Sequence, residues 1–199
     1  MMFRMSRPRV VCLGDSITQR GHDVTTGGWL SLLQSQLCRS VDLVNRGFSG
    51  YNTDWLLAEF DTIKSDFAAA ALVVILMGAN DSAADVQHVP LARFKTNMIE
   101  LVRKCKDAGA AKVVLVTTPW VDGPAWLEFC RNDQTSSQFG QSEPNRCAAE
   151  AKKYSQAGSC NILFLSRWRV HHINQSLDCK ARMKRIGIRI GIKILGSQT

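Results

Sequence analysis

The stretch VVCLGDSIT, residues 10–18, decides how this chain folds. The four apolar residues at positions 10–13 are typical of a short buried strand, and the glycine that follows permits a tight turn. The turn predicts a helix that starts near Ser16, with the hydroxyl exposed and backbone N–H groups directed at whatever it attacks. Such a hydroxyl is either a nucleophile or a helix cap, because Asp and Ser both commonly cap helices.

Apolar runs and helical stretches alternate along the rest of the chain. Further strands are predicted at residues 41–45, 71–77, 112–117 and 161–165, and helices at 28–38, 53–64, 90–108 and 143–157. The run at 71–77 is continuously apolar, as expected for a central parallel strand that is covered on both faces. This alternation predicts an α/β fold with a mostly parallel sheet, and residues 119–141 are predicted to form a long polar loop.

Polar residues follow successive strands of this predicted sheet. Gly47 ends the second strand, where it allows a close backbone approach and a free N–H, and Asn80 follows the third strand with a side-chain amide. Each segment alone could be an ordinary turn. Because the carboxyl ends of parallel strands meet at one edge, we expect Ser16, Gly47, Asn80 and the loop that begins near Trp120 to form one site.

Five motifs resemble the GDSL/SGNH hydrolase family, and in particular its isoamyl-acetate-hydrolysing esterase branch. They are GDSITQ (14–19), GGW (27–29), NRGFSGYNT (45–53), GANDS (78–82) and HVPL (88–91), and the resemblance covers roughly residues 9–165. It implies a three-layer αβα, flavodoxin-like fold with five parallel strands, and hydrolysis of small or medium acyl esters. The G-x-S-x-G elbow of the α/β-hydrolases is absent around Ser16.

The resemblance also implies roles for individual residues. Ser16 is expected to be the nucleophile, and the N–H groups of Ser16 and Gly47 with the Asn80 amide are expected to form the oxyanion hole. Donors fixed where negative charge develops are worth about 10²–10³-fold in rate each. No metal or cofactor is implied. The residues expected to contact the substrate are Asp15, Trp120 and Trp126.

The catalytic base is not identified by these motifs. Family members carry a D-x-x-H pair near the C-terminus, in which Asp orients the His that takes the serine proton. The one match to this spacing is Asp85 and His88, directly after the GANDS motif, and we interpret it as a coincidence. His171 and His172 follow the predicted fifth strand without an aspartate three residues earlier. They remain weak candidates for the base, and we interpret them as surface histidines in an irregular tail.

The last fifth of the chain differs in composition from the rest. Residues 161–199 contain eight Lys/Arg residues and one acid, Asp178, so they carry +7 of the total charge of +8. Isoleucine occupies every second position from 186 to 194, which is the period of a strand and not of the amphipathic helix expected in the family. We therefore divide the chain into an esterase domain, 1–165, and an atypical basic tail, 166–199, expected to be poorly ordered. One hypothesis is a frameshifted or alternatively spliced C-terminus.

The composition bounds the remaining classes of function. Hydrophobic residues make up 45% and charged residues 21%, and no apolar run reaches the roughly 18 residues of a membrane span. The N-terminal apolar stretch is too short for a signal peptide, and the seven cysteines are odd in number and have no CxxC spacing. We expect reduced thiols, no metal site and a cytoplasmic location.

Two alternatives to an active esterase follow from the tail. In the first, the chain keeps the hydrolase fold and binds ligands but is catalytically impaired. In the second, the basic tail binds nucleic acid or an anionic membrane surface. The tail has no RNA-binding signature, and its alternating isoleucines favour aggregation over recognition, so we do not expect a nucleic-acid partner.

Overall fold

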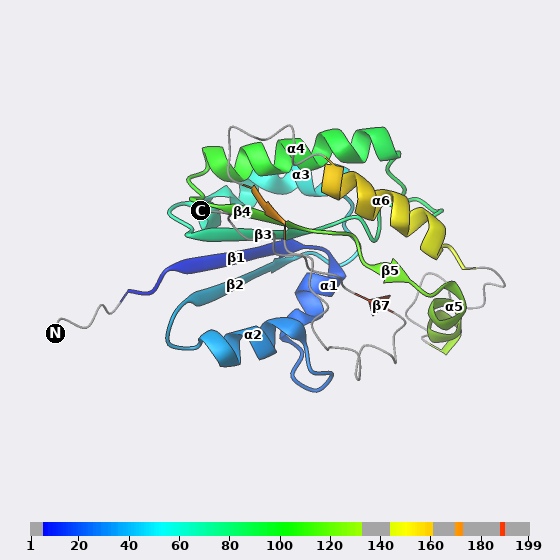
Figure 1. The fold of residues 1–199 in the computed structure, drawn as a ribbon, viewed down its shortest axis with the longest axis horizontal. Helices are drawn as coiled ribbons and strands as arrows, with labels where there is room; N and C mark the ends of the chain where they lie inside the picture. Colours follow the sequence, from blue (N-terminus) through cyan, green and yellow to red (C-terminus); the bar gives the residue numbers. More distant parts are fainter. Residues whose placement is uncertain (1–5, 133–143, 161–169, 173–187, 190–199) are drawn as a thin grey trace, which may run out of the picture.

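A parallel sheet of five strands runs through the middle of the protein (Figure 1). This computed structural model describes residues 6–132, 144–160, 170–172 and 188–189. The strands are β1 (Arg9–Gly14), β2 (Asp42–Gly47), β3 (Leu72–Leu76), β4 (Val113–Val116) and β6 (Val170–His172), in the spatial order β2-β1-β3-β4-β6. All neighbouring pairs are parallel, which confirms the predicted five-stranded sheet.

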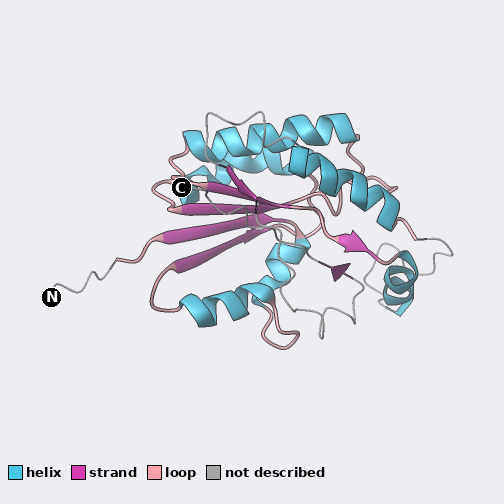
Figure 2. Ribbon diagram, in the orientation of Figure 1, coloured by secondary structure: helices cyan, strands magenta, loops and turns pink. Residues whose placement is uncertain are grey.

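Helices cover both faces of the sheet (Figure 2). The helices α3, α4 and α6 lie over one face, and α2 lies over the other, so the predicted three-layer αβα architecture is confirmed. The helices are α1 (Ser16–Gln19), α2 (Trp29–Leu37), α3 (Thr53–Ile63), α4 (Leu91–Asp107), α5 (Gly123–Asn132) and α6 (Ala148–Cys160), with 3-10 turns η1 (Arg20–His22) and η2 (Lys64–Phe67).

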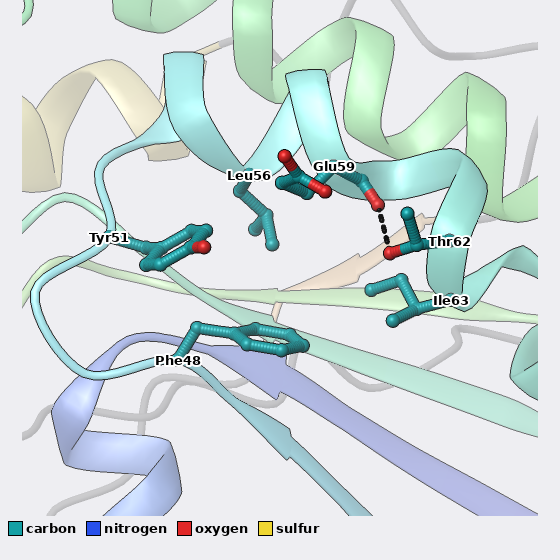
Figure 3. Close-up of a pocket in the computed structure, with 6 residues that line it drawn as sticks. All are labelled: Phe48, Tyr51, Leu56, Glu59, Thr62 and Ile63. Atoms are coloured by element: carbon teal, nitrogen blue, oxygen red, sulfur yellow. Dashed lines mark hydrogen bonds between the residues drawn. The ribbon is translucent and has the colours of Figure 1, made fainter.

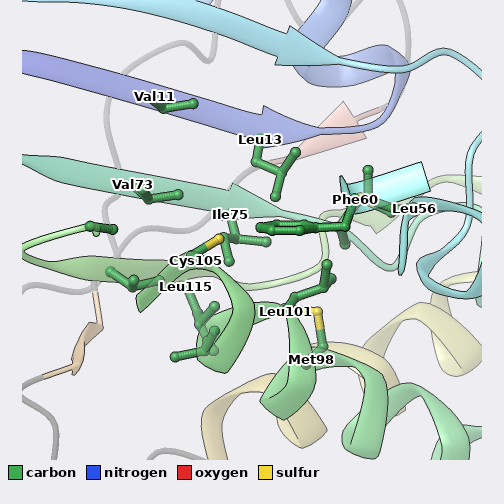
Figure 4. Close-up of a cluster of buried hydrophobic side chains, with 14 of the residues drawn as sticks. Val11, Leu13, Leu56, Phe60, Val73, Ile75, Met98, Leu101, Cys105 and Leu115 are labelled. Carbon is green, nitrogen blue, oxygen red and sulfur yellow. The ribbon is translucent and has the colours of Figure 1, made fainter. Parts of the chain in front are cut away.

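The main hydrophobic core lies between the sheet and helices α3, α4 and α6 (Figure 4). Successive residues of a strand point to opposite faces. On β1, Val11 and Leu13 therefore enter this core, whereas Val10 and Cys12 pack against Leu30 of α2 on the other face. Burial on both faces explains why these strands appear in the sequence as continuous apolar runs. It also holds the carboxyl ends of β1 and β3 rigidly, and the candidate site is built on those ends.

The connection after β4 differs from the long polar loop predicted at residues 119–141. Its described part contains strand β5 (Trp120–Val121) and helix α5, while residues 133–143 lie outside the described residues. Asp122 precedes α5, and its Oδ1 accepts a hydrogen bond from the N–H of Ala125 at 3.1 Å. Pro124 lies in the first turn, where its fixed φ suits a helix. The loop prediction was wrong because it weighed polar composition above this capping signal.

The fifth strand of the sheet is β6, which contains His171 and His172. Their backbones pair with Val114 and Leu115 of β4, so the interpretation of an irregular tail at these two residues was wrong. Pairing with the edge of β4, a tertiary contact, sets their conformation there. The strand predicted at 161–165 lies outside the described residues. The helix predicted from 143 begins only at Ala148, since the residues before it reach back to the loop after β3.

A second, two-stranded sheet joins the connection after β4 to the end of the chain. Strand β7 (Ile188–Arg189) pairs antiparallel with β5, with Trp120 opposite Arg189 and Val121 opposite Ile188. At these two positions the chain is extended, as the alternating isoleucines predict. Over the described segments, the helices are all too short or too polar to cross a membrane.

Candidate active site

Ser16 is the first residue of α1, and only Asp15 separates it from the end of β1. Asp15 caps this helix, because its Oδ1 accepts a hydrogen bond from the N–H of Ile17 at 2.9 Å. The capping role therefore belongs to Asp15, and the half-buried Ser16 is left available for chemistry. Asp15 is only 1% exposed and holds the turn, and its expected contact with the substrate remains a prediction.

Gly47 lets α1 lie across the end of β2. A Cβ at this position would lie 2.0 Å from the backbone nitrogen of Gln19, so any side chain here would displace the helix. The prediction that the N–H of Gly47 is free was wrong. It donates a hydrogen bond to the side-chain Oδ1 of Asn45 at 2.8 Å. The Asn45 amide also donates to the carbonyls of Thr18 and Gln19, at 2.9 and 3.1 Å. Asn45 thus ties the end of α1 to β2, a role that the sequence did not reveal.

Asn80 lies in the turn that follows β3 and is 2% exposed. Its Nδ2 donates to the carbonyl of Tyr51 at 2.7 Å, and its Oδ1 accepts from Nη2 of Arg146 at 2.6 Å. A guanidinium can only donate, so the amide oxygen faces Arg146 and the NH₂ group faces away from it. The NH₂ group carries two N–H bonds, of which the contact with Tyr51 uses one.

Asp81, the next residue, fixes the same turn to the start of α3. Its Oδ1 accepts from the N–H and the hydroxyl of Thr53, at 2.9 and 2.5 Å. Asn97 of α4 donates in turn to the Thr53 hydroxyl at 2.9 Å. These contacts explain why the motif around Asn80 and the motif that ends at Thr53 occur together: one holds the other in place.

Two buried carboxyl groups lie under the site. Burial raises the pKa of Asp15 to about 6, an effect that the Ile17 N–H and then the positive charge of Arg146 oppose, while the charge of Asp81 adds to it. Burial likewise raises the pKa of Asp81 to about 6, against the hydrogen bonds from Thr53. In both, one carboxyl oxygen has no hydrogen-bond partner among the described residues. Burial therefore places the pKa of both carboxyl groups above its usual range.

Arg146, which precedes α6, is a site residue that the sequence did not reveal. It donates to the carbonyl of Ala79 at 2.8 Å and to the side chains of Asn80 and Gln87 at 2.6 and 3.3 Å. A single cation in a polar stretch belongs to no periodic pattern, and its partners are far away in the sequence. In the sequence, Asn145 and Arg146 are two polar residues at the end of a polar stretch. They have no characteristic spacing that would have indicated a role.

The two tryptophans of the connection after β4 have different surroundings. The ring of Trp126 lies 4.9 Å from the guanidinium carbon of Arg146, and its Nε1 donates to Oδ1 of Asn145 at 3.1 Å. Trp126 therefore supports Arg146, and its expected contact with the substrate remains a prediction. Trp120 is 49% exposed in β5, so it is the more accessible of the two to a ligand.

The histidines divide into two groups. His88 and Asp85 do not face each other as a catalytic pair: Nδ1 of His88 lies 3.1 Å from the carbonyl of Ala83, and Asp85 accepts from Gln87 and Asn145. Asp85 and His88 lie in one turn, in which the N–H of His88 donates to the carbonyl of Asp85 at 3.0 Å. His171 and His172 lie in β6, and His172 is its last residue, at the edge of the sheet where β1 and β3 also end.

A small hollow of about 80 Å³ lies between α3 and the chain that leaves β2 (Figure 3). Phe48 and Tyr51 come from the segment between β2 and α3, and Figure 3 shows their rings facing the helix. Tyr51 is also the residue whose carbonyl accepts from Asn80. The lining residues are Phe48, Tyr51, Leu56, Glu59, Thr62 and Ile63.

Comparison with known proteins identifies related sequences. A family model described as the GDSL-like lipase/acylhydrolase family matches residues 12–151. The chain is 39% identical over 132 residues to the isoamyl acetate-hydrolyzing esterase 1 homolog of Bos taurus, a match that covers 62% of this chain and 52% of that protein. For the homolog of Mus musculus, the identity is 36% over 159 residues, which covers 73% and 63%. The chain thus spans little more than half the length of these relatives.

Solved structures resemble the fold at lower identity. An acetylxylan esterase from Geobacillus stearothermophilus aligns with a TM-score of 0.57 and 17% identity, over 83% of this chain and 76% of that one. LAE5, an alpha/beta hydrolase enzyme from the metagenome of Lake Arreo, aligns with a TM-score of 0.55 and 21% identity, over 82% and 75%. At these identities the likeness shows the fold and not the reaction.

Proposed function

Since the chain belongs to the GDSL-like lipase/acylhydrolase family, we propose that it hydrolyses carboxylic esters of small or medium acyl groups, with Ser16 as the nucleophile. The proposal rests on one observation: the neighbouring strands β1, β2 and β3 end at the same edge of the sheet. Gly14 of β1 pairs with Gly47 of β2 and with Leu76 of β3, so Ser16, Gly47 and the Asn80 turn follow adjacent positions of the sheet. The relatives named as isoamyl acetate-hydrolyzing esterases support ester substrates.

In the first step, Ser16 Oγ attacks the ester carbonyl carbon and its proton passes to a base. Negative charge develops on the carbonyl oxygen, where the N–H of Ser16 and the second N–H of the Asn80 amide stabilise it. The N–H of Gly47 contributes once its bond to Asn45 is shared or exchanged for the oxyanion. The alcohol then leaves with the proton from the base, and an acyl group remains on Ser16.

In the second step, water attacks the acyl group on Ser16, again with the help of the base, and the acid is released. His172 is our candidate for this base. It ends β6, which runs parallel to β4, so its backbone lies at the same edge of the sheet as Ser16. His171 precedes it and lies one residue further from the end of the strand, which makes it the weaker candidate.

The direct test is hydrolysis of p-nitrophenyl acetate, butyrate and octanoate by the wild type and by Ser16→Ala. We expect the substitution to reduce kcat/KM by about 10⁴-fold or more, with the shorter esters preferred. Ser49→Ala is the matched control, because Ser49 is an exposed serine two residues after Gly47, the last residue of β2. Equal rates for wild type and Ser16→Ala would reject the proposal.

A second candidate function is a ligand-binding relative with impaired catalysis. The observation in its favour is that, among the described side chains, Asp85 and His88 hold separate partners and do not form an Asp-His pair. Modification of Ser16 by a fluorophosphonate separates the two candidates, since it requires an activated serine. A chain that binds short esters but is not modified at Ser16 would be the binding protein.

We also infer a cytoplasmic location. The cysteines Cys12, Cys38, Cys105, Cys130 and Cys147 are all free thiols, which suits a reducing compartment. Fractionation of cells that express the tagged chain would test this, and recovery in a secreted fraction would contradict it.

A further inference from the structure

We propose that Arg146 is a positioning residue of the oxyanion hole: it orients and polarises the Asn80 amide so that its N–H stabilises the developing negative charge. The inference rests on the proposed role of Ser16 as nucleophile. Arg146 itself does not touch the reacting atoms, because it lies on the oxygen side of the amide, opposite to the NH₂ group. Its effect must therefore pass through Asn80.

The guanidinium spans the loop that follows β3. Nη1 donates to the carbonyl of Ala79, and Nη2 donates to Oδ1 of Asn80 and to Oε1 of Gln87. Arg146 therefore binds the backbone carbonyl of one residue of the turn and the side chain of the next residue. This geometry needs two donors in a rigid plane, which a lysine cannot supply.

The amide is held at both ends. Its NH₂ group donates to the carbonyl of Tyr51, and its oxygen accepts from the cation at 2.6 Å. A charged donor on the amide oxygen draws electron density from the NH₂ group, so that group becomes a stronger donor to an anion. The neutral carbonyl of the bound ester gains little from this, whereas the tetrahedral oxyanion gains much more. The contribution of Arg146 should therefore appear in kcat and not in KM.

Arg146 is itself fixed in place. The ring of Trp126 lies 4.9 Å from its guanidinium carbon, and Asn145 is bound by the backbone N–H of Ala84 and the carboxylate of Asp85. Burial lowers the pKa of Arg146, and the charges of Asp15 and Asp85 oppose this effect. We expect a cation held by an aromatic ring and by hydrogen bonds to reorganise little when the oxyanion forms, and pre-organised charge of this kind is effective in catalysis.

The kinetic test compares Arg146→Met, Arg146→Lys, Asn80→Ala and the double variant that combines Arg146→Met with Asn80→Ala. The substrate is p-nitrophenyl acetate. Arg46→Met is the control, because it removes another partly buried guanidinium, one that binds Asp66. We expect Arg146→Met to reduce kcat by about 10- to 100-fold with little change in KM, and Arg146→Lys to restore only part of the rate.

If Arg146 acts through Asn80, Arg146→Met should cost far less in the Asn80→Ala background. Additive losses in kcat, or a loss that appears in KM alone, would overturn the proposal.

A spectroscopic test does not depend on turnover. In ¹H–¹⁵N spectra, the side-chain amide of Asn80 is identified by its disappearance in Asn80→Ala. We expect its resonances to move in Arg146→Met and Arg146→Lys and to stay unchanged in Arg46→Met. If Arg146→Met does not fold, Arg146→Lys provides the same reading. Unmoved resonances would reject the positioning role even in an active enzyme. Moved resonances in a chain whose Ser16→Ala variant is as slow as the wild type would reject the proposed hydrolase function and leave the orientation of Asn80 by Arg146 in place.

Discussion

The segments that follow β1 and β2 are held differently from the chain that follows β4. In the first group, side chains close their own turns: Asp15 caps the helix that Ser16 begins, and Asn45 binds Gly47 two residues later. In the second group, Arg146 reaches back over 67 and 66 residues to Ala79 and Asn80. The nucleophile and the N–H of Gly47 are therefore placed mainly by local contacts, whereas the Asn80 amide is held by Tyr51 and Arg146 from distant parts of the chain. The groups that would activate them depend on long-range contacts.

The most severe test of this contrast is His172→Ala, which removes the proposed base from the second group. We expect kcat/KM for p-nitrophenyl acetate to fall by about 10²–10⁴-fold, because the serine proton then has no acceptor. His171→Ala is the matched control, since His171 lies one residue further from the end of β6. Equal losses in the two variants would mean that β6 matters as a strand and not through the imidazole of His172.

The next test breaks the local group at Gly47. Gly47→Ala places a methyl group 2.0 Å from the backbone nitrogen of Gln19, so α1 must move. We expect the free energy of unfolding in urea to fall by about 3 kcal/mol or more, and the esterase rate to fall with it. Gly50→Ala is the comparison, because a Cβ there meets nothing closer than 3.7 Å and the residue has φ of +83°. We expect that variant to lose about 1 kcal/mol through backbone strain alone. A smaller loss at Gly47 than at Gly50 would contradict the close packing of α1.

The sequence predicted the first group far better than the second. The apolar runs gave the first four strands in their correct positions, because strands buried on both faces carry a strong hydrophobic signal. The motifs around Ser16, Gly47 and Asn80 were placed at one edge of the sheet, since parallel strands share their carboxyl ends. Even there, the bond between Gly47 and Asn45 escaped prediction, because the reach of a side chain is not visible in a pattern of residues.

The second group escaped prediction for a physical reason. Helix α5 was hidden in a polar stretch, Arg146 has partners more than sixty residues away, and β6 forms by pairing with the edge of β4. The contacts of Arg146 and the pairing of β6 have no period of two or 3.6 residues that a window of sequence could reveal. The contact of Trp126 with Arg146 was not predicted either, because it joins residues twenty positions apart.

The dependence of stability on pH examines the turn that carries Asn80, which Asp81 fixes to the start of α3. The folded-state pKa of Asp81 is about 6, above its usual value, so the folded protein binds more protons than the unfolded chain between about pH 4 and 6. The stabilisation from this group is complete at low pH and is lost as the pH rises through 6. We expect Asp81→Asn to remove a pH-dependent loss on the order of 2 kcal/mol, measured by urea unfolding from pH 4 to 7.

Asp66→Asn is the control of opposite sign for this pH experiment. Its hydrogen bond with Arg46 lowers the pKa of the Asp66 carboxyl, so its stabilisation is present above the unfolded-state pKa and is lost as the pH falls. The Asp66 variant should therefore lose stability at neutral pH and little at low pH. An Asp81→Asn variant whose stability follows the same pH curve as the wild type would show that Asp81 titrates normally in the folded protein.

The smallest expected effect concerns Trp126, whose ring and N–H support Arg146 in different ways. Trp126→Phe keeps an aromatic face for the guanidinium but loses the hydrogen bond from Nε1 to Asn145, so we expect it to cost about 0.5–1.5 kcal/mol of unfolding free energy. Trp126→Ala also removes the ring and should lower kcat, because the guanidinium then loses the surface that fixes it over Asn80. If Trp126→Ala instead raises KM and leaves kcat unchanged, Trp126 contacts the substrate directly, and the long-range group after β4 binds the ester and does not position the oxyanion hole.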